Sequence, residues 1–151
     1  MAIDSQTISR LESQVGVEWP PLVYYIERGM IMRFVRAVGD PNPLWQDDVY
    51  AGKSRYGGIV APPNFILILG FTQILDAFTL DPSLTVLHGS TELECHQPVR
   101  LGDIITTTSK ITGVRERNSK AGRTAFVTME MVHRNQRQEA VARCSHMVLI
   151  Y

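Results

Sequence analysis

One apolar segment constrains the fold of this chain more than any other part of its sequence. It covers residues 64–78, where apolar side chains occupy nearly every side of a helix, at Phe65, Ile66, Leu67, Ile68, Leu69, Phe71, Ile74, Leu75 and Phe78. A helix that is apolar all round is stable only when its neighbours bury it. The segment therefore predicts a buried central helix that the rest of the chain encloses.

Four stretches that follow this segment have the composition of β-strands. They are rich in Thr, Val and Ile, turn residues separate them, and they cover residues 84–94, 103–114, 124–134 and 139–150. One face of the last stretch is apolar because alternate residues share it, namely Ala140, Ala142, Cys144, His146, Val148 and Ile150. Long antiparallel strands around one buried helix predict the α+β class, with the sheet wrapped around that helix.

The first part of the chain predicts two further helices and a short strand. Ser5 is expected to cap a short amphipathic helix, and residues 22–26 are expected to form a strand. Apolar residues then recur at helical spacing over residues 27–38, and Gly39 ends the pattern. Residues 40–63 show no regular pattern, and so long a connection in a compact domain is usually functional. We therefore expect candidate site residues in this connection.

Length, charge and cysteine content exclude several classes of protein. At 151 residues the chain is expected to form one domain, residues 1–151. Its 15 basic and 15 acidic side chains cancel, so we expect neither a nucleic acid nor a membrane as partner. Cys95 and Cys144 lack metal-binding spacing, which predicts reduced thiols and no metal site. An early acid, Asp4, and no apolar leader predict a cytoplasmic protein.

Four short motifs in a fixed order give the chain a family resemblance. They are Gly39-Asp40-Pro41-Asn42-Pro43, Tyr56-Gly57-Gly58-Ile59-Val60-Ala61-Pro62-Pro63, His88-Gly89 and Pro98-Val99-Arg100-Leu101-Gly102-Asp103. Through them the chain resembles the MaoC-like dehydratases and (R)-specific enoyl-CoA hydratases, in particular their FAS1-like N-terminal dehydratase branch. The resemblance implies a hot-dog fold, a long central helix wrapped by an antiparallel sheet, and a homodimer or heterodimer formed through that sheet. It also implies 2-enoyl or 3-hydroxyacyl thioesters as substrates, with coenzyme A or phosphopantetheine entering as part of the substrate and no other cofactor.

The resemblance also implies roles for individual residues. In that family an Asp and a His of the pattern Gly-Asp-x-Asn-Pro-x-His share the acid/base work, and a backbone N–H near the central helix holds the thioester oxygen. Asp40 matches the catalytic carboxylate, and Asn42 would orient it or the attacking water. Gly57 or Gly58 would supply the N–H, because a thioester can approach a glycine without meeting a Cβ. Trp45 stands where the family has its His, and an indole N–H donates a hydrogen bond but transfers no proton at neutral pH.

Three explanations of this substitution remain open from the sequence. The chain is either the catalytically incomplete half of a hydratase or dehydratase heterodimer, or an enzyme active alone, or a subunit that binds acyl thioesters without converting them. Activity alone would require Asp40 together with another group such as His88 or a bound water. The rival enzyme class is an acyl-CoA thioesterase, because a carboxylate near a helix N-terminus could activate water for hydrolysis. The order of the Gly-Asp-x-Asn-Pro run favours the hydratase.

Several further side chains are candidates for contact with the substrate. Tyr56 is expected to face the pocket or simply to pack, and structural hydrogen bonding is the leading interpretation of His88. The hairpin that contains Arg117 and Lys120 carries four cations against one acid. Such a hairpin is usually only solvated, and the alternative is that these cations bind the phosphates of coenzyme A or phosphopantetheine. The two remaining histidines outside the predicted apolar faces are interpreted as surface or rim residues, His96 and His133.

Overall fold

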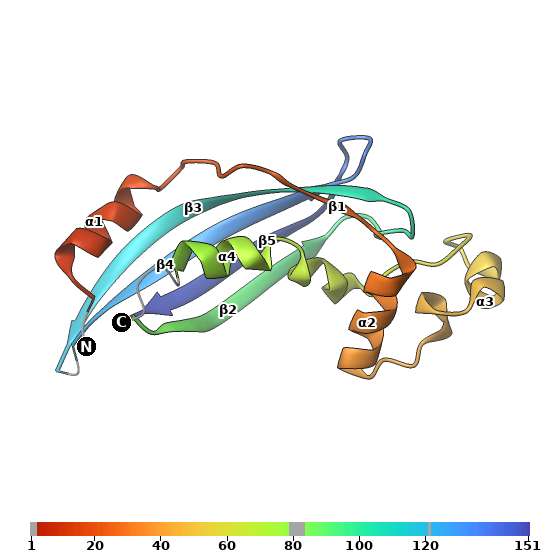
Figure 1. Cartoon of the computed structure of the whole chain (residues 1–151), viewed down its shortest axis with the longest axis horizontal. Coiled ribbons are helices and arrows are strands. Elements are labelled where there is room, and N and C mark those ends of the chain that lie inside the picture. The colour runs from red at the N-terminus through yellow and green to blue at the C-terminus, as the bar shows by residue number, and fades with distance from the viewer. Residues whose placement is uncertain (1–2, 79–83, 121) are drawn as a thin grey trace.

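A five-stranded antiparallel sheet forms the centre of the computed structural model, which describes residues 3–78, 84–120 and 122–151 (Figure 1). Its strands are β1 (Leu22–Tyr25), β2 (Val86–Cys95), β3 (Ile104–Ser119), β4 (Gly122–Arg134) and β5 (Ala140–Ile150). Their order across the sheet is β1-β3-β4-β5-β2, and every neighbouring pair is antiparallel. The sheet therefore ends in β1 on one side and in β2 on the other. Together with the helices it confirms the predicted α+β class.

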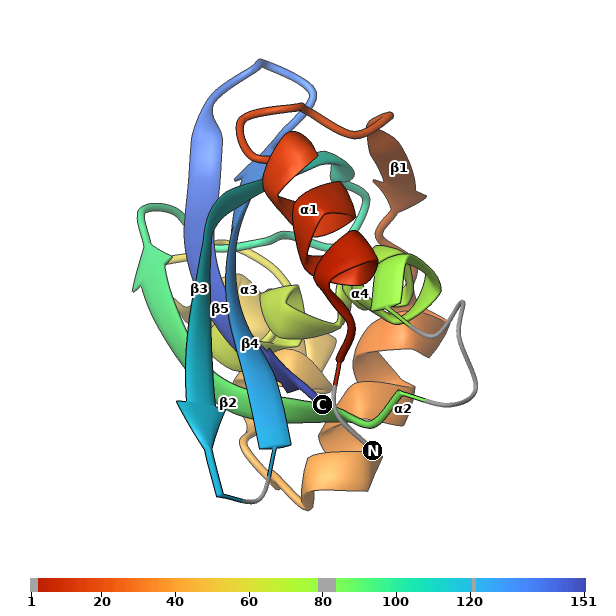
Figure 2. The ribbon, with the colours of Figure 1, turned by 90° about the vertical axis from the view of Figure 1, so that its left-hand side faces the viewer.

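Helices cover one face of the sheet and gather at one of its ends. They are α1 (Ser5–Ser13), α2 (Arg28–Val38), η1 (Pro43–Trp45), α3 (Asp48–Lys53), η2 (Pro63–Ile68) and α4 (Phe71–Phe78). Figures 1 and 2 show α4 against the sheet, α1 beside it, and α2 with α3 at one end of the molecule. The hairpin between β3 and β4 lies at the opposite end (Figure 1). The connection that was expected to carry site residues thus lies at the α2–α3 end.

Local chemistry explains where the first helices begin and end. The helix predicted over residues 27–38 is α2, and Gly39 ends it with a φ of 69° in the left-handed region. The cap of α1 is Asp4 and not Ser5, because Asp4 Oδ1 accepts from Thr7 N at 2.6 Å. The connection after α2 is more regular than predicted, since it contains η1 and α3. A side-chain oxygen caps each of these two, from Asn42 and Asp47 respectively.

The central helix is present, but it is interrupted. Its first part is the 3₁₀-helix η2, and Gly70, with a φ of 86°, separates η2 from α4. Gly70 also approaches the sheet closely, since a Cβ there would lie 3.0 Å from Thr107 Cγ2 and 3.1 Å from Met131 Sδ. Such an approach requires a residue without a side chain. The prediction of one continuous helix over residues 64–78 was therefore wrong, although the segment does lie at the centre of the fold.

The segment buries one side against the sheet and exposes another. The buried residues belong to the main hydrophobic core and are Phe65, Ile66, Leu69, Ile74 and Phe78. In contrast, Ile68, Phe71 and Leu75 are 45%, 42% and 43% exposed. Burial on every side was therefore also a wrong prediction. These three residues therefore form an apolar stripe that is partly exposed in the part of the chain that the structure describes.

One histidine predicted at the rim lies at the centre of the sheet. His133 is 0% exposed, because it continues the core-facing alternation of β4 through Met129 and Met131. Its Nδ1 is hydrogen-bonded to Thr107 Oγ1 at 2.8 Å, and its Nε2 lies 3.5 Å from Cys144 Sγ. Burial and the nearby His146 lower the pKa of His133 from 6.5 to about 4. His133 is therefore a neutral core residue, whereas His96 is exposed as predicted.

Candidate functional site

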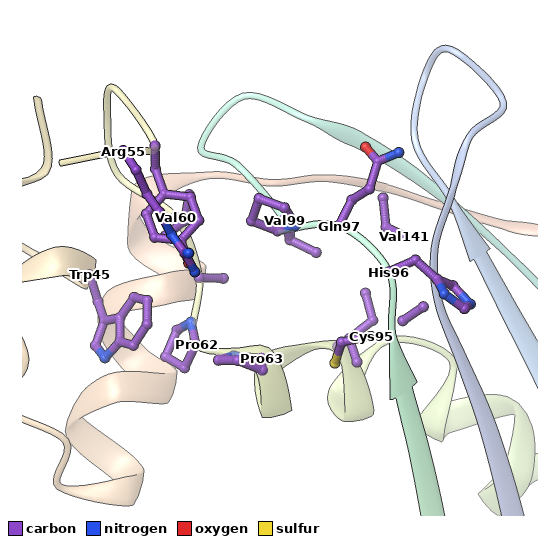
Figure 3. A pocket seen from close by; sticks show the side chains of 15 residues that line it. Trp45, Arg55, Val60, Pro62, Pro63, Cys95, His96, Gln97, Val99 and Val141 are labelled. Atoms are coloured by element: carbon purple, nitrogen blue, oxygen red, sulfur yellow. The ribbon is translucent and has the colours of Figure 1, made fainter.

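A cavity of about 430 Å³ opens at the α2–α3 end of the sheet (Figure 3). Trp45 and the segment from Arg55 to Ile66 form one wall, and the chain from Cys95 to Val99 forms the other with the start of β5. Its lining is mostly apolar, and comprises Trp45, Arg55, Tyr56, Val60, Ala61, Pro62, Pro63, Ile66, Cys95, His96, Gln97, Pro98, Val99, Val141 and Ala142. A cleft of this size and character suits an apolar ligand with a polar head.

Backbone hydrogen bonds join the two walls into one rigid unit. Ala61 N donates to Val99 O at 2.8 Å, and Leu101 N donates to Ile59 O at 3.1 Å. The guanidinium of Arg100 also donates to the carbonyl oxygen of Tyr56. The two motifs that begin at Tyr56 and at Pro98 are thus side by side in space, although some forty residues separate them in the sequence.

Asp103 anchors the turn that carries the second wall. It is only 8% exposed, and its Oδ2 accepts from Arg100 N at 2.8 Å. Its Oδ1 accepts from Gln136 Nε2 at 3.1 Å, and Gln136 Oε1 in turn accepts from Ile104 N. The Asp103 carboxylate is therefore a buried structural group. Its role explains why an Asp ends the Pro98–Asp103 motif.

Both oxygens of the Asp40 carboxylate already have hydrogen-bond donors. Oδ2 accepts from the indole Nε1 of Trp45 at 2.8 Å, and Oδ1 accepts from the backbone N of Asn42 at 3.0 Å. Asp40 itself does not line the cavity, and it reaches the cavity wall only through the half-buried Trp45 ring. Asn42 contacts Asp40 through its backbone, because its side-chain oxygen accepts from Leu44 N at 2.9 Å. The pair Asp40–Trp45 is therefore a brace that fixes one wall.

The glycines after Tyr56 differ in what their N–H groups do. Gly57 has a φ of 69°, and its N–H donates to Ser54 O at 3.0 Å within a turn. The N–H of Gly58 donates to no acceptor within the described residues. Tyr56 lines the cavity, and its hydroxyl accepts from Arg55 Nη2 at 2.6 Å. Neither glycine lines the cavity, and of the two only Gly58 has an N–H without an acceptor among the described residues.

Three predicted contact residues lie away from this cavity in the single chain. His88 is an exposed residue of β2, and its Nε2 is hydrogen-bonded to Thr91 Oγ1 at 2.8 Å. Seven residues of strand, roughly 23 Å, separate it from Cys95 in the cavity wall. Arg117 and Lys120 are at the β3–β4 hairpin, at the far end of the sheet (Figure 1). A contact of these two cations with the phosphates of coenzyme A or phosphopantetheine stays a prediction.

Sequence reasoning missed most of the second wall. Cys95, Gln97, Val99 and Val141 line the cavity, and none was predicted to do so. Burial raises the pKa of the Cys95 thiol, which therefore stays protonated at neutral pH. The Pro98–Asp103 motif was the only available signal for this wall, because the strands that position it belong to distant parts of the sequence.

Comparisons with known proteins agree with this architecture. The FAS1-like dehydratase domain region matches residues 13–144. A UPF0336 protein of Streptomyces avermitilis is 32% identical over 143 residues, which cover 91% of this chain and 93% of that protein. An (R)-hydratase structure from Pseudomonas aeruginosa aligns with a TM-score of 0.72 and 21% identity, over 89% of this chain and 79% of that chain. The HadBC (3R-hydroxyacyl-ACP dehydratase) complex from Mycobacterium tuberculosis aligns with a TM-score of 0.75 and 21% identity, over 90% of this chain and 96% of that chain.

These similarities fix the class of protein. The sheet order and the central helix are those of the hot-dog fold shared with MaoC-like dehydratases and (R)-hydratases. The chain belongs to the FAS1-like dehydratase family. The predicted family and the predicted fold are thereby confirmed.

Two predicted absences can be compared with the part of the chain that the structure describes. No cluster of three His, Cys, Asp or Glu side chains there could hold a metal ion. No helix in the same residues has the length and apolar character needed to cross a membrane.

Proposed function

We propose that this chain is the acyl-thioester-binding, catalytically incomplete half of a two-chain hot-dog hydratase or dehydratase. Its substrates are 2-enoyl or 3-hydroxyacyl thioesters of coenzyme A or of an acyl carrier protein. The cavity at Trp45 holds part of the acyl thioester, and a second hot-dog chain supplies the Asp and His that move protons. No cofactor other than the thiol carrier of the substrate belongs to this proposal.

The hydrogen bond from Trp45 Nε1 to Asp40 Oδ2, 2.8 Å long, carries this proposal. Hydration requires a group that takes a proton from water and a group that gives one to the α-carbon. Trp45 can do neither. Its indole N–H donates to Asp40 Oδ2, an oxygen that could otherwise accept a hydrogen bond from the attacking water. In the single chain, His88 is too far along β2 to replace that His. The site is therefore suited to binding and unsuited to proton transfer.

The structural relatives support a second chain. One structural relative is, by its name, the HadBC (3R-hydroxyacyl-ACP dehydratase) complex. The structural alignment with it covers 90% of the residues of this chain. A two-chain arrangement explains how a family member keeps its binding cavity and its Asp while lacking the His.

The purified chain alone is expected to bind enoyl thioesters without converting them. Titration calorimetry with crotonyl-CoA and with a long-chain enoyl-CoA measures binding, and loss of conjugated absorbance measures hydration. Release of free thiol, followed in parallel, identifies a thioesterase. If hydration occurs in the chain alone and Asp40→Asn abolishes it, Asp40 is a catalytic base and the incomplete-half proposal is wrong. If the wild type and Asp40→Asn both fail to react, Asp40 has no catalytic role in the single chain, and weaker binding by Asp40→Asn would support its role as a brace of the cavity wall.

Filling the cavity is expected to weaken that binding. Cys95→Trp places a large ring inside the cavity from a residue that is itself exposed, so the fold tolerates the change. We expect the affinity for a long-chain enoyl-CoA to fall by about tenfold or more, since a single bulky group removes most of an apolar subsite. Val49→Trp is the matched control, because Val49 is 68% exposed and does not line the cavity. If the wild type, Cys95→Trp and Val49→Trp bind the long-chain enoyl-CoA with equal affinity, the acyl chain does not bind in this cavity.

A further inference from the structure

A second cavity, of about 410 Å³, lies between α1 and α4. Its walls come from α1, from the connection between α1 and β1, from α4 and from β3, and Figure 2 shows α1 and α4 next to each other. No residue that lines this cavity also lines the first cavity, the one at Trp45. The second cavity, which we call the α1–α4 cavity, is therefore distinct from the candidate site described above.

The close approach of Gly70 to the sheet separates the two cavities along the central segment. Ile66 lines the first cavity and Gln73 lines the α1–α4 cavity, and Gly70 lies between them in the chain. A Cβ at Gly70 would already lie 3.0 Å from Thr107 Cγ2 and 3.1 Å from Met131 Sδ, so no acyl chain fits between this residue and the sheet. A ligand of the α1–α4 cavity is therefore a separate molecule, and not the far end of a chain that passes beneath Gly70.

Hydrogen bonds within the protein hold the walls of the α1–α4 cavity in place. Trp19 N donates to Ser109 O at 2.8 Å, which fixes the connection after α1 to β3. The side chain of Gln73 joins α4 to both of these elements, because its Nε2 donates to Pro20 O at 2.7 Å and its Oε1 accepts from Ser109 Oγ at 2.9 Å. The cavity is therefore preformed, as sites for small molecules usually are.

The floor of this cavity is apolar, and its mouth carries charges of both signs. Leu11, Phe78 and Ile111 are buried lining residues and form the floor. Arg10 on α1 and Asp76 on α4 are exposed lining residues on opposite walls. Within the described residues neither of these two side chains takes part in an ion pair, with the other or with a third residue. A ligand thus meets an apolar surface inside and both a cation and an anion at the mouth.

The two charges at the mouth disfavour an ionic ligand. A carboxylate there would be attracted by Arg10 and repelled by Asp76, and an ammonium group would experience the reverse. A hydroxyl or a primary amide can accept from the Arg10 guanidinium and donate to the Asp76 carboxylate. The mouth therefore fits an uncharged polar group.

We propose that the α1–α4 cavity is a second binding site, whose ligand is an uncharged apolar molecule with one hydroxyl or primary amide group. A cavity of this volume accepts a ligand of about ten to twenty non-hydrogen atoms. The FAS1-like dehydratase region begins at residue 13, so Arg10 and Leu11 of the α1 wall lie outside the part of the chain that matches the family. The site is therefore not implied by the family match, and it does not depend on the function proposed above.

The two tryptophans of the chain report on the two cavities separately, because Trp19 lines the α1–α4 cavity and Trp45 lines the first cavity. Trp45→Phe therefore leaves a single indole, whose fluorescence responds to a ligand of the α1–α4 cavity. Three probes with the same alkyl chain test the polar group, namely 1-decanol, decanoate and decylamine. In this variant 1-decanol should change the emission in a saturable manner, and the two ionic probes should bind about threefold or more weakly.

Further substitutions in the Trp45→Phe background make the test specific to this cavity. Ala77→Phe fills the cavity and should weaken 1-decanol binding by about tenfold or more. Thr72→Phe is the matched control, because Thr72 is exposed on the same helix and does not line the cavity. Asp76→Asn should make decanoate bind at least as tightly as 1-decanol, and Arg10→Gln should do the same for decylamine, because each leaves a single charge at the mouth.

A response to 1-decanol that does not saturate, or equal affinity in Ala77→Phe and Thr72→Phe, would show that the α1–α4 cavity is not the binding site. Decanoate or decylamine binding as tightly as 1-decanol in Trp45→Phe would overturn the uncharged class of ligand. If urea unfolding shows that Ala77→Phe does not fold, Asp76→Asn and Arg10→Gln decide the question, because both change only exposed side chains. An unchanged ranking of the three probes in both variants would then reject the site.

Discussion

Acidification from about pH 7 to about pH 4 is expected to lower the free energy of unfolding by about 3 kcal/mol through His133 alone. Burial and the nearby His146 lower the pKa of this residue from 6.5 to about 4 in the folded protein. In the unfolded chain the imidazole regains its ordinary pKa, so the unfolded state binds the proton first. The contribution is therefore complete above about pH 6.5, declines as the pH falls, and is lost by about pH 4.

Urea unfolding at a series of pH values measures this loss. His133→Gln removes the titrating group, so the variant should be less stable at neutral pH but should lose much less stability on acidification. His96→Gln is the control, because His96 is exposed and should leave the wild-type pH dependence unchanged. If His133→Gln keeps the full wild-type slope, the buried imidazole is not the origin of the acid sensitivity.

The position of His133 was readable from the sequence in principle. β4 places Val127, Met129 and Met131 on the core face, and the next residue of that alternation is His133. A histidine alone suggests a polar surface, and the alternation of its strand is the stronger signal. The same alternation did place His146 correctly on the apolar face of β5.

Long, strongly patterned elements were predictable, and features that depend on distant contacts were not. The strands and α2 follow from local periodicity and from Gly39, which ends the helix. At the break, Gly70 lies close to Thr107 and Met131, which are distant in the sequence. The residues on both sides of Gly70 are apolar, so the local sequence does not predict that the helix is interrupted there. A single glycine in such a segment is a weak signal without knowledge of the sheet.

One wall of the candidate site was predictable from the local sequence, and the other was not. One wall belongs to the segment around Asp40, Trp45 and Tyr56, and the motifs there identified it directly from the sequence. The hydrogen bond between Asp40 and Trp45 joins residues only five positions apart, so their proximity was expected. The opposite wall at Cys95 and Val141 exists because β2 and β5 pair. Pairing of strands fifty residues apart cannot be deduced from either strand alone.

Substitution of Gly70 by Ala is expected to destabilise the chain by about 3 kcal/mol, through two separate effects. The φ of 86° places this residue in the left-handed region, where any Cβ costs roughly 1–2 kcal/mol. The new Cβ would also lie 3.0 Å from Thr107 Cγ2 and 3.1 Å from Met131 Sδ, and relieving such overlap in a packed core costs about 1–3 kcal/mol. Urea unfolding of the variant measures the sum.

Gly102→Ala separates the two effects, because Gly102 has a similar φ of 90° but no atom within 4 Å of its ideal Cβ. This control should lose only the backbone term, roughly 1–2 kcal/mol. The difference between the two variants then isolates the contact between the central segment and the sheet. If the two variants are equally destabilised, Gly70 is required for its backbone conformation alone. If Gly70→Ala is clearly the less stable, the close approach of Gly70 to Thr107 and Met131 adds its own cost to that of the left-handed backbone.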